Sequence, residues 1–505
     1  MSYDDRLYFN GIDAATGEYL QAPCRPEELA RSLTGGAEPD PDPPSPELLE
    51  RARHKARGDR VRGVATGIDP CELAEAGWGV VLPAVEPGSS RARRQQEILA
   101  ALQPLLEHRR AQATRHDERL FQVFDGARGL RPAESKRQFL GRHGAGAGPV
   151  DPLKVPYYLL LVGDPEEIPF SLQHQLDVPH AVGRLCFDSP EGYAAYAHTV
   201  VRAETSPVPP SRRRELAMLA VTHPGDPATA LSRRALVDPL AERLASAAPD
   251  WTVRRYVDEH ATKADLARLL GGDATPAVLF TASHGVGLGI DDPRQRSHQG
   301  ALLCGDWGGP GTGPASPEHY LAAEDIGDTA RLDGLIVFSF ACYCAGTPRL
   351  DDYGHRSGPG VRREIARAPF VAALPQRLLS LPSGALATIG HVDRAWGTSF
   401  VWPGTSRSPQ LAAFESTLRE LLGGVPVGAA MEYLDMRYAE LAAELSSELE
   451  GLEPGELHDA AGLVTLWTAT NDARGYAVMG DPAVRLPWPP STDRLRGRGR
   501  VQGPR

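Results

Sequence analysis

The sequence has few cysteines and no long apolar run. Six cysteines spread over 505 residues are too few for a disulfide scaffold. No stretch approaches the ~20 apolar residues that a membrane-spanning helix needs. The first letters, MSYDDRLYFNGID, lack the basic segment and apolar core of a secretory signal peptide. These absences predict a cytoplasmic protein with reduced thiols and no membrane contact.

An excess of basic residues is also missing. The chain has 54 Lys and Arg against 65 Asp and Glu, a formal net charge of −11, which argues against a nucleic-acid partner. A Gly- and Arg-rich stretch, RLRGRGRVQGPR at 494–505, is typical of a disordered tail. Hydrophobic residues make up 41% and charged residues 24%, which is ordinary for a globular protein.

Composition divides the chain into four parts. Residues 1–74 are rich in Pro, Arg and acidic residues and predict a partly flexible N-terminal arm and linker. We expect an N-terminal α/β subdomain at 75–210, a larger catalytic domain at 215–490 and a disordered basic tail at 491–505.

Apolar strand patterns alternate with helical patterns over most of the chain. Strands are predicted at 77–85, 155–164, 216–222, 252–257, 277–283, 334–341, 384–391 and 475–482. Helices are predicted at 90–120, 191–204, 229–247, 262–270, 370–380, 408–423 and 428–450. This alternation favours an α/β fold in which helices cover both faces of a mostly parallel sheet.

Two of the predicted strands end at a reactive side chain. VLFTASHGVG (278–287) reaches His284, and GLIVFSFACYCAGTP (334–348) reaches Cys342. Functional residues of open parallel sheets gather at the carboxyl ends of the strands. A lone Cys is more often a small buried hydrophobe and a lone His a capping residue. Two such residues at ends of strands that could be neighbours indicate a Cys-His dyad.

The chemistry of a thiol nucleophile accounts for the residue types. A thiol with a pKa near 8.5 is mostly protonated at neutral pH, so an adjacent imidazole must take its proton. Gly285 follows the histidine directly, leaves room for a substrate backbone and offers its N–H to the oxygen of the attacked carbonyl. These features predict Cys342 as nucleophile, His284 as base and Gly285 as oxyanion-hole donor.

FTASHG followed by FSFACYCAG resembles the His-Gly and Ala-Cys motifs of the caspase–gingipain clan of cysteine peptidases. The spacing of 58 residues is close to the ~50 of caspases. YYLLLVGDPEEIPF…LDVPHAVGRL resembles the N-terminal subdomain of gingipain-like members, and GYAVMGDPAVRLP resembles the last core strand of gingipain-like and CHAT-type members. The resemblance implies a caspase-like three-layer sandwich and a cysteine endopeptidase. It matches His284 to the family's base, Cys342 to its nucleophile and Gly285 to its oxyanion glycine.

The substrate preference stays open at this stage. The caspase pattern Gln-Ala-Cys-Arg/Gln-Gly is here Phe-Ala-Cys-Tyr-Cys, so a preference for Asp does not carry over. Cleavage after Arg or Lys requires a carboxylate in the pocket. The resemblance to Arg-specific gingipains suggests Asp177, while Asp393, with Trp396 as a pocket wall, is the competing candidate.

The segment beyond Cys342 is rich in Arg and Gly. In caspase-like enzymes such a loop often carries an activation cleavage, which makes Arg356, Arg362 and Arg363 candidates for self-processing; a plain surface loop is the alternative. No organic cofactor or metal is implied. Asp291 and Asp292 are a candidate for calcium, although two adjacent carboxylates do not make a site.

Two other functions are consistent with the sequence. In the first, the chain is an inert caspase-like scaffold whose N-terminal region recruits a partner. In the second, Cys342 and Cys344 hold a metal or act in redox chemistry, although a second sequence-local ligand pair is missing. A peptidase would act on a protein or peptide substrate, with an activating partner at its N-terminal region.

Overall fold

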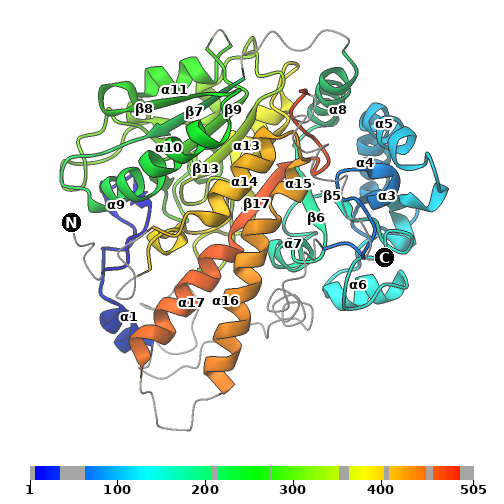
Figure 1. The fold of residues 1–505 in the computed structure, drawn as a ribbon, viewed down its shortest axis with the longest axis horizontal. Coiled ribbons are helices and arrows are strands. Elements are labelled where there is room, and N and C mark those ends of the chain that lie inside the picture. The colour runs from blue at the N-terminus through cyan, green and yellow to red at the C-terminus, as the bar shows by residue number, and fades with distance from the viewer. Residues whose placement is uncertain are drawn as a thin grey trace, which may run out of the picture.

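The computed structural model describes residues 6–33, 63–206, 214–272, 274–351, 363–402, 409–450 and 459–488. In these ranges a ten-stranded sheet runs through the molecule, with helices packed against it (Figure 1). The predicted α/β sandwich is therefore confirmed. The predicted tail at 491–505 lies outside the described residues.

The main sheet has two halves of opposite direction. Its strand order is β4 (Phe121–Phe124), β3 (Trp78–Val81), β5 (Tyr158–Val162), β6 (Ala181–Leu185), β17 (Tyr476–Gly480), β16 (Ala387–His391), β13 (Ile336–Phe340), β9 (Val278–Ala282), β7 (Glu215–Ala220) and β8 (Thr252–Val257). All neighbours pair in parallel except β16 and β17, which are antiparallel. The late strand β17 thus joins the strands of the two predicted subdomains.

Two smaller sheets complete the strands of the described ranges. The first has the order β12 (Tyr320–Leu321), β11 (Leu302–Leu303), β10 (Gly285–Gly287), β1 (Gly11–Asp13) and β2 (Glu18–Tyr19). The second pairs β14 (Gly346–Thr347) with β15 (Phe370–Val371). β1 and β2 belong to the predicted arm, so the described part of that arm is folded against β10, directly after His284.

Helices follow the strands along the chain. In chain order they are α1 (Pro26–Leu33), α3 (Leu73–Ala76), α4 (Ser90–Ala101), α5 (Gln103–Ala113), α6 (Lys136–Arg142), α7 (Phe170–Asp177), α8 (Pro190–Thr205), α9 (Pro227–Leu231), α10 (Asp238–Ala247), α11 (Lys263–Leu269), α12 (Gln295–His298), α13 (Ala373–Ser380), α14 (Ala412–Leu422), α15 (Val427–Ala430), α16 (Glu432–Glu450) and α17 (Ala460–Arg474). Within the described ranges, none is both long and apolar enough for a membrane span.

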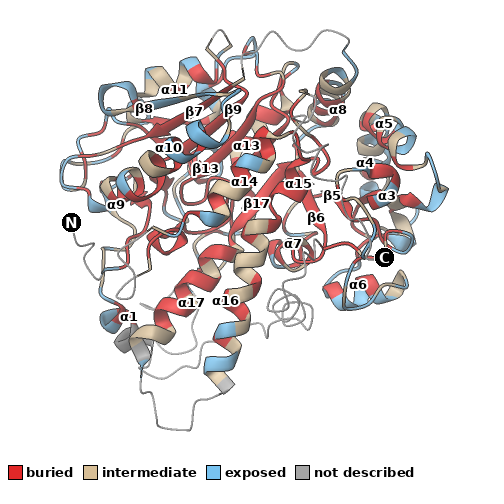
Figure 2. Ribbon diagram, in the orientation of Figure 1, coloured by how far each residue is buried: buried red, intermediate tan, exposed pale blue. Residues whose placement is uncertain are grey.

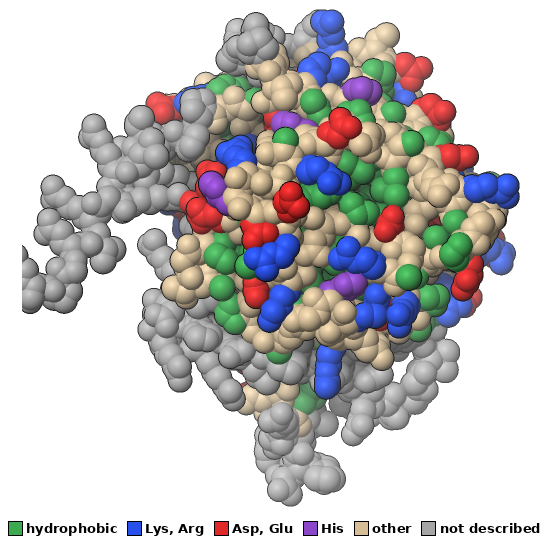
Figure 3. Space-filling model, turned by 90° about the vertical axis from the view of Figure 1, so that its right-hand side faces the viewer, with side chains coloured by type: hydrophobic (Ala, Val, Ile, Leu, Met, Phe, Trp, Pro, Cys, Tyr) green, Lys and Arg blue, Asp and Glu red, His purple; other side chains and the backbone are tan. Residues whose placement is uncertain are grey.

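The core lies in the central strands, because helices cover them. The strands β5, β9, β13 and β16 are buried along their whole length, whereas the edge strand β8 is largely exposed (Figure 2). Helices α10, α14 and α16 pack beside one another, and α8 packs against α4, α5 and α13. On the face shown in Figure 3, acidic and basic side chains are interspersed.

Some predicted elements differ in their bounds. The helix expected at 90–120 is two helices, α4 and α5, which meet at Leu102; Pro104, which lacks an N–H, lies in the first turn of α5. The helix expected at 229–247 is α9 and α10 with a π-helical stretch, Ser232–Val237, between them. Helix α17 was not expected. Its apolar residues show no single broad core face, because most of them cluster with apolar residues of α16.

Candidate active site

Three adjacent parallel strands bring the candidate residues to one edge of the sheet. β9 lies between β13 and β7, and Ala282 is paired with Phe340 on one side and with Ala220 on the other. His284 lies two residues after Ala282, and Cys342 lies two residues after Phe340. Asp226 lies in the loop after β7. The predicted adjacency of the histidine and cysteine strands is confirmed. The side-chain roles remain a proposal.

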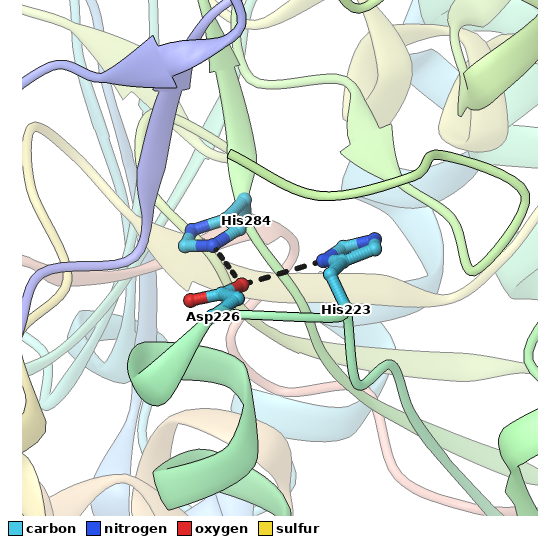
Figure 4. A group of neighbouring side chains, drawn as sticks. All are labelled: His223, Asp226 and His284. Carbon is cyan, nitrogen blue, oxygen red and sulfur yellow. Dashed lines mark hydrogen bonds and ion pairs between the residues drawn. The ribbon is translucent and has the colours of Figure 1, made fainter. Parts of the chain in front are cut away.

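Asp226 holds the imidazole of His284. Its Oδ2 lies 2.7 Å from His284 Nε2, and both side chains are fully buried (Figure 4). Because the carboxylate only accepts, Nε2 carries the hydrogen and Nδ1 carries the lone pair in the neutral ring. Nδ1 is buried and has no hydrogen-bond partner among the described residues. In this tautomer, Nδ1 of His284 can accept a proton.

The carboxylate of Asp226 is itself fixed from several sides. As N-cap of α9 it accepts hydrogen bonds from the backbone N–H groups of Ala228 and Thr229, at 3.0 and 3.4 Å, and from Thr229 Oγ1 at 2.6 Å. Burial alone would raise the pKa of Asp226, but the charge of His284 and the hydrogen bonds from His223, His284 and Thr229 hold it well below its ordinary value. The group is therefore an anion in the folded protein.

Two further rings surround this pair. The Tyr19 hydroxyl donates to Asp226, and its ring packs edge-on against His284 with centroids 5.7 Å apart. His223 Nδ1 lies 3.4 Å from Asp226 Oδ2, and its Nε2 donates to the Cys304 carbonyl at 2.9 Å (Figure 4). Burial and the neighbouring Asp226 raise the pKa of the Tyr19 hydroxyl, so it remains a donor. The N-terminal region therefore supplies part of the site.

Cys342 is fully buried, and its sulfur contacts one residue of the loop after β16. Sγ accepts a hydrogen bond from Ala395 N at 3.1 Å and lies 3.7 Å from Ala395 O. Burial raises the pKa of the Cys342 thiol well above its ordinary value. A thiol in this state is a nucleophile only when a base removes its proton during the attack.

Two backbone N–H groups point at one carbonyl oxygen. Gly285 N and Cys342 N lie 3.1 and 3.3 Å from the oxygen of Asn10. The backbones of the two donors touch, since a Cβ on Gly285 would lie 1.8 Å from the Cys342 oxygen. Only glycine fits there. Paired donors at this spacing are the geometry of an oxyanion hole.

The segment that ends in Asn10 lies across this edge as an extended chain. Gly397 N donates to Tyr8 O at 2.8 Å, and Asn10 N donates to Ala395 O at 3.0 Å. An antiparallel bridge pairs Phe9 with Trp396 between these two bonds. After Asn10 the chain continues as β1, in parallel register with β10.

The backbone is strained next to the nucleophile. Tyr343 has φ 57° and Asp393 has φ 74°, both in the left-handed region that side chains rarely adopt. Tyr343 N donates to Asp393 O at 2.7 Å, so the two strained residues hold each other. Strain of this kind clusters at functional sites, where the surrounding structure imposes it.

The sulfur of Cys344 contacts other residues than the sulfur of Cys342 does. Its Sγ accepts from His391 N at 3.2 Å and lies 3.5 Å from Ser339 O, whereas Cys342 contacts Ala395. Burial raises the pKa of Cys344 to about 11 and lowers that of His391 to about 3. The two cysteines therefore occupy different surroundings, and His391 is a neutral core residue.

The predicted pocket residues lie in different settings. Trp396 packs against Phe9, with ring centroids 5.3 Å apart, so it contacts the N-terminal segment that ends in Asn10. Asp393 is buried in the strained turn. Asp177 ends α7, where burial and Asp435 raise its pKa well above the ordinary value.

The predicted processing and calcium residues are only partly described. Arg356 and Arg362 lie outside the described residues, while Arg363 is exposed. Asp291 forms an ion pair with Arg367, and Asp292 forms one with Arg294 at 2.8 Å. Both carboxylates are thus engaged by arginines.

One group in the described part of the chain has the spacing of metal ligands. Ligand atoms of His223, Asp226 and His284 all lie within 4.8 Å of one another. The donor set would suit zinc. The same oxygens of Asp226, however, already accept hydrogen bonds from Thr229, Tyr19 and the backbone of α9. The residues therefore fit a hydrogen-bonded carboxylate better than an open metal site.

Sequence reasoning missed Asp226, His223, Tyr19 and Asn10. The letters VTHPGDP directly after a strand contain an Asp-Pro helix start, which is a readable N-cap signal. Asp226 also contacts His284 because β7 lies beside β9 in the sheet, and this strand order cannot be read from the sequence. Asn10 lies in a short segment without periodicity, so no sequence signal placed it.

Comparisons with known proteins gave matches to solved structures alone. No family model and no curated protein matches the chain. It is similar to a structure described as "Structure of Protease" at 13% identity and TM-score 0.45, covering 85% of this chain and 81% of that one. It is similar to the Arg-specific cysteine proteinase gingipain R (RgpB) at 12% sequence identity and a TM-score of 0.42, over 81% of this chain and 78% of that one. It is also similar to separase of Saccharomyces cerevisiae, in complex with securin, at 10% identity and a TM-score of 0.30, over 68% of this chain and 18% of that one.

Proposed function

We propose that the protein is a cysteine endopeptidase. The observation that carries this proposal is the convergence of Gly285 N and Cys342 N on one peptide carbonyl oxygen, at the sheet edge that also carries the Cys342 thiol and the His284 imidazole held by Asp226. An acyl-transfer enzyme needs these parts together: a nucleophile, a base, a group that orients the base and donors for the oxyanion. The His-Gly and Ala-Cys motifs, which resemble those of the caspase–gingipain clan, support the same reaction.

In the acylation step, Cys342 Sγ attacks the substrate carbonyl while Nδ1 of His284 takes the thiol proton. The raised thiol pKa makes this transfer part of the attack. Negative charge on the carbonyl oxygen is met by the N–H groups of Gly285 and Cys342. His284 then gives its proton to the leaving amine, and a thioester remains.

Hydrolysis completes the cycle. His284 removes a proton from water, which attacks the thioester, and the thiol returns as the acid product leaves. Asp226 does not touch the substrate. It is a positioning residue that fixes the tautomer of His284 and stabilises the imidazolium that forms in both steps.

Several substrate preferences agree with this machinery. Cleavage after Arg or Lys would use a carboxylate, for which Asp177 and Asp393 remain the candidates; Arg363 would then be a processing site. An inert scaffold is the alternative to any activity. It gives no reason for a buried, unpartnered Nδ1 on His284 beside two aligned N–H groups.

The test is hydrolysis of fluorogenic peptides that end in Asn, Asp, Arg, Lys or Leu. We expect one class to be cleaved, and Cys342→Ala or His284→Ala to reduce kcat/KM by at least ~10³-fold. Cys344→Ala is the matched control, since this thiol lies in the same turn but contacts His391 and Ser339.

A labelling experiment separates enzyme from scaffold. A peptide carrying a thiol-reactive electrophile should modify Cys342 in the wild type and not in His284→Ala. Absence of hydrolysis for every peptide, together with equal labelling of both proteins, would contradict the peptidase proposal.

A further inference from the structure

We infer that the Asn10–Gly11 peptide bond is a site of self-cleavage, and that the pocket around Asn10 selects asparagine in substrates. This inference rests on the proposed peptidase function. It deepens that function by naming the side chain that precedes the cut bond. The observations are the backbone path of residues 8–13, the contacts of the Asn10 amide and the position of the Cys342 sulfur.

The backbone of the segment has the arrangement of a bound substrate. The carbonyl oxygen of Asn10 accepts from Gly285 N and Cys342 N, so this one peptide carbonyl occupies the oxyanion hole. Sγ of Cys342 and the amide N of Asn10 both lie against Ala395 O, at 3.7 and 3.0 Å. The sulfur of Cys342 and the backbone of Asn10 are therefore held by the same carbonyl, and the backbone N–H of Cys342 binds the Asn10 oxygen directly.

The side chain of Asn10 is enclosed by hydrogen-bond acceptors. Asn10 is 1% exposed. Its Nδ2 donates to Ser232 Oγ at 3.0 Å and to Ser283 O at 3.4 Å. Ser232 Oγ gives its own hydrogen to Ala228 O at 3.0 Å, so toward Asn10 it accepts. Both partners accept, and an amide NH₂ is the group that satisfies them.

This arrangement discriminates between isosteric side chains. A carboxylate in place of the amide would put an acceptor oxygen at the Nδ2 position, against the two acceptors, and would bury a charge, since the Oδ1 position has no hydrogen-bond partner among the described residues. Sites that hydrogen-bond a substrate group reject analogues that lack it far more strongly than apolar pockets reject a missing methyl group. The pocket therefore favours Asn over Asp.

The residue before Asn10 is held just as firmly. Phe9 packs on Trp396, and the guanidinium of Arg394 lies 5.0 Å from the Phe9 ring centroid. The antiparallel bridge to Trp396 fixes its backbone. The predicted pocket wall, Trp396, thus contacts the side chain that precedes the asparagine.

The reaction balances as an ordinary hydrolysis. Sγ of Cys342 bonds to the carbonyl carbon of Asn10, the bond to Gly11 N breaks, and His284 passes the thiol proton to the Gly11 amine. Water then cleaves the thioester, so that Asn10 ends in a carboxylate and the thiol is restored. The products are a peptide ending at Asn10 and a chain beginning at Gly11.

The remaining chain keeps the site intact after this cut. Gly11–Asp13 stay paired with Gly285–Gly287 and with β2, and Tyr19 keeps its bond to Asp226. Release of the residues up to Asn10 empties the oxyanion hole and the asparagine pocket. The cut therefore converts a filled cleft into one open to substrate.

The test follows the purified full-length protein by intact-mass spectrometry during incubation at pH 7. We expect the wild type to lose the segment that ends at Asn10 and Cys342→Ala to keep it. The rate should not depend on protein concentration, because nucleophile and bond lie in one chain. A rate proportional to concentration would overturn cleavage within the chain.

Asn10→Asp is the matched variant for the pocket, because it keeps the shape and removes the donor. We expect its cleavage to be slower by at least ~10²-fold. Equal rates for both side chains would overturn the asparagine pocket. Spontaneous deamidation of Asn10 changes the mass slightly but removes no segment, so the intact mass distinguishes it from cleavage. Any cleavage that does not need the Cys342 thiol appears in Cys342→Ala as well.

The outcomes separate this inference from the proposed function. Hydrolysis of external peptides that depends on Cys342, with an intact Asn10–Gly11 bond, would overturn self-cleavage and leave the peptidase standing. Peptides ending in Asn should be cleaved fastest once the segment is gone; a faster Arg or Lys peptide would overturn the asparagine pocket alone. No hydrolysis and no labelling of Cys342 would overturn both.

Discussion

Asp226 Oδ2 lies 2.7 Å from His284 Nε2, although 58 residues separate them in the chain. The contact exists because β7 and β9 are neighbours whose carboxyl ends meet at one edge. Cys342 comes from the next strand, β13, on the other side of β9. The proposed orienting acid, base and nucleophile thus follow the order of the three strands β7, β9 and β13, and the register of the sheet sets the spacing of their backbones.

Asp226→Asn tests the role of this contact. The amide keeps the cap on α9 but loses the charge that stabilises the imidazolium. We expect kcat to fall by about 10²–10⁴-fold with little change in KM, since Asp226 does not touch the substrate. Asp226→Glu should recover part of kcat. An equal change in kcat and KM for both variants, with a lowered Tm, would indicate a structural role instead.

Gly285→Ala should disable the oxyanion hole. A Cβ at this position would lie 1.8 Å from the Cys342 carbonyl oxygen, so the two backbones must separate and the donors lose their common target. We expect at least ~10²-fold lower kcat/KM. The control is Gly289→Ala, where a Cβ would meet no atom within 4 Å. Unchanged activity in Gly285→Ala would contradict the assigned donors.

Glu204→Gln tests a buried network away from the site. Arg109 is 1% exposed and bonds Glu204 at 2.7 Å and Asp481 at 2.6 Å, linking α5, α8 and the turn after β17. Loss of one charge should reduce the free energy of unfolding by about 3–5 kcal/mol. Urea denaturation measures this. Glu97→Gln, at an exposed position of α4, should change it by less than ~0.5 kcal/mol.

The same network makes stability depend on pH. Burial alone would raise the pKa of Glu204, but Arg109 and His108 outweigh it and hold the pKa far below the ordinary value. A depressed carboxyl pKa stabilises the fold above the ordinary pKa of Glu, and this contribution is lost as the pH falls below it. We expect the stability of Glu204→Gln to fall less between pH 6 and 3 than that of the wild type. Parallel curves would contradict the ionised pair.

A chelator should leave hydrolysis unchanged. His223, Asp226 and His284 have the spacing of metal ligands, but the proposed reaction uses His284 as a base. Added zinc should inhibit, because a metal bound to His284 Nε2 beside Asp226 would displace the hydrogen there and leave the ring's hydrogen on Nδ1, the atom proposed to accept the thiol proton. Inhibition by EDTA, reversed by zinc, would assign these residues to a metal instead.

The sequence predicted the main strands because their apolar runs are short and clearly bounded. β8 has the predicted bounds, and His284 and Cys342 lie on adjacent strands as expected. Asp226 could not be assigned, since its function depends on which strand lies beside β9. The prediction of one helix at 90–120 missed the break at Leu102, although Pro104 is a residue that often marks the start of a helix.

The role of the N-terminal segment could not be read from the sequence at all. Residues 8–13 carry no strand periodicity, and their backbone pairs mostly with distant segments, at 285–287 and 395–397, besides the short hairpin with β2. The distant pairing is decided by tertiary contacts alone. The predicted flexible arm contributes, in its described part, a strand that lies against the edge with His284 and Cys342.

The position of β17 has a consequence for how the protein is made. Tyr476–Gly480 lie in the middle of the main sheet, between β6 and β16, although all the other strands of the described ranges precede them in the chain. A ribosome must therefore synthesise the chain past residue 480 before the two halves can join. The edge with His284 and Cys342 belongs to the second half, whose inner border strand, β16, pairs with β13 but has an open edge on its other side until then. Synthesis itself thus delays the joining of the two halves until residue 480 has been made.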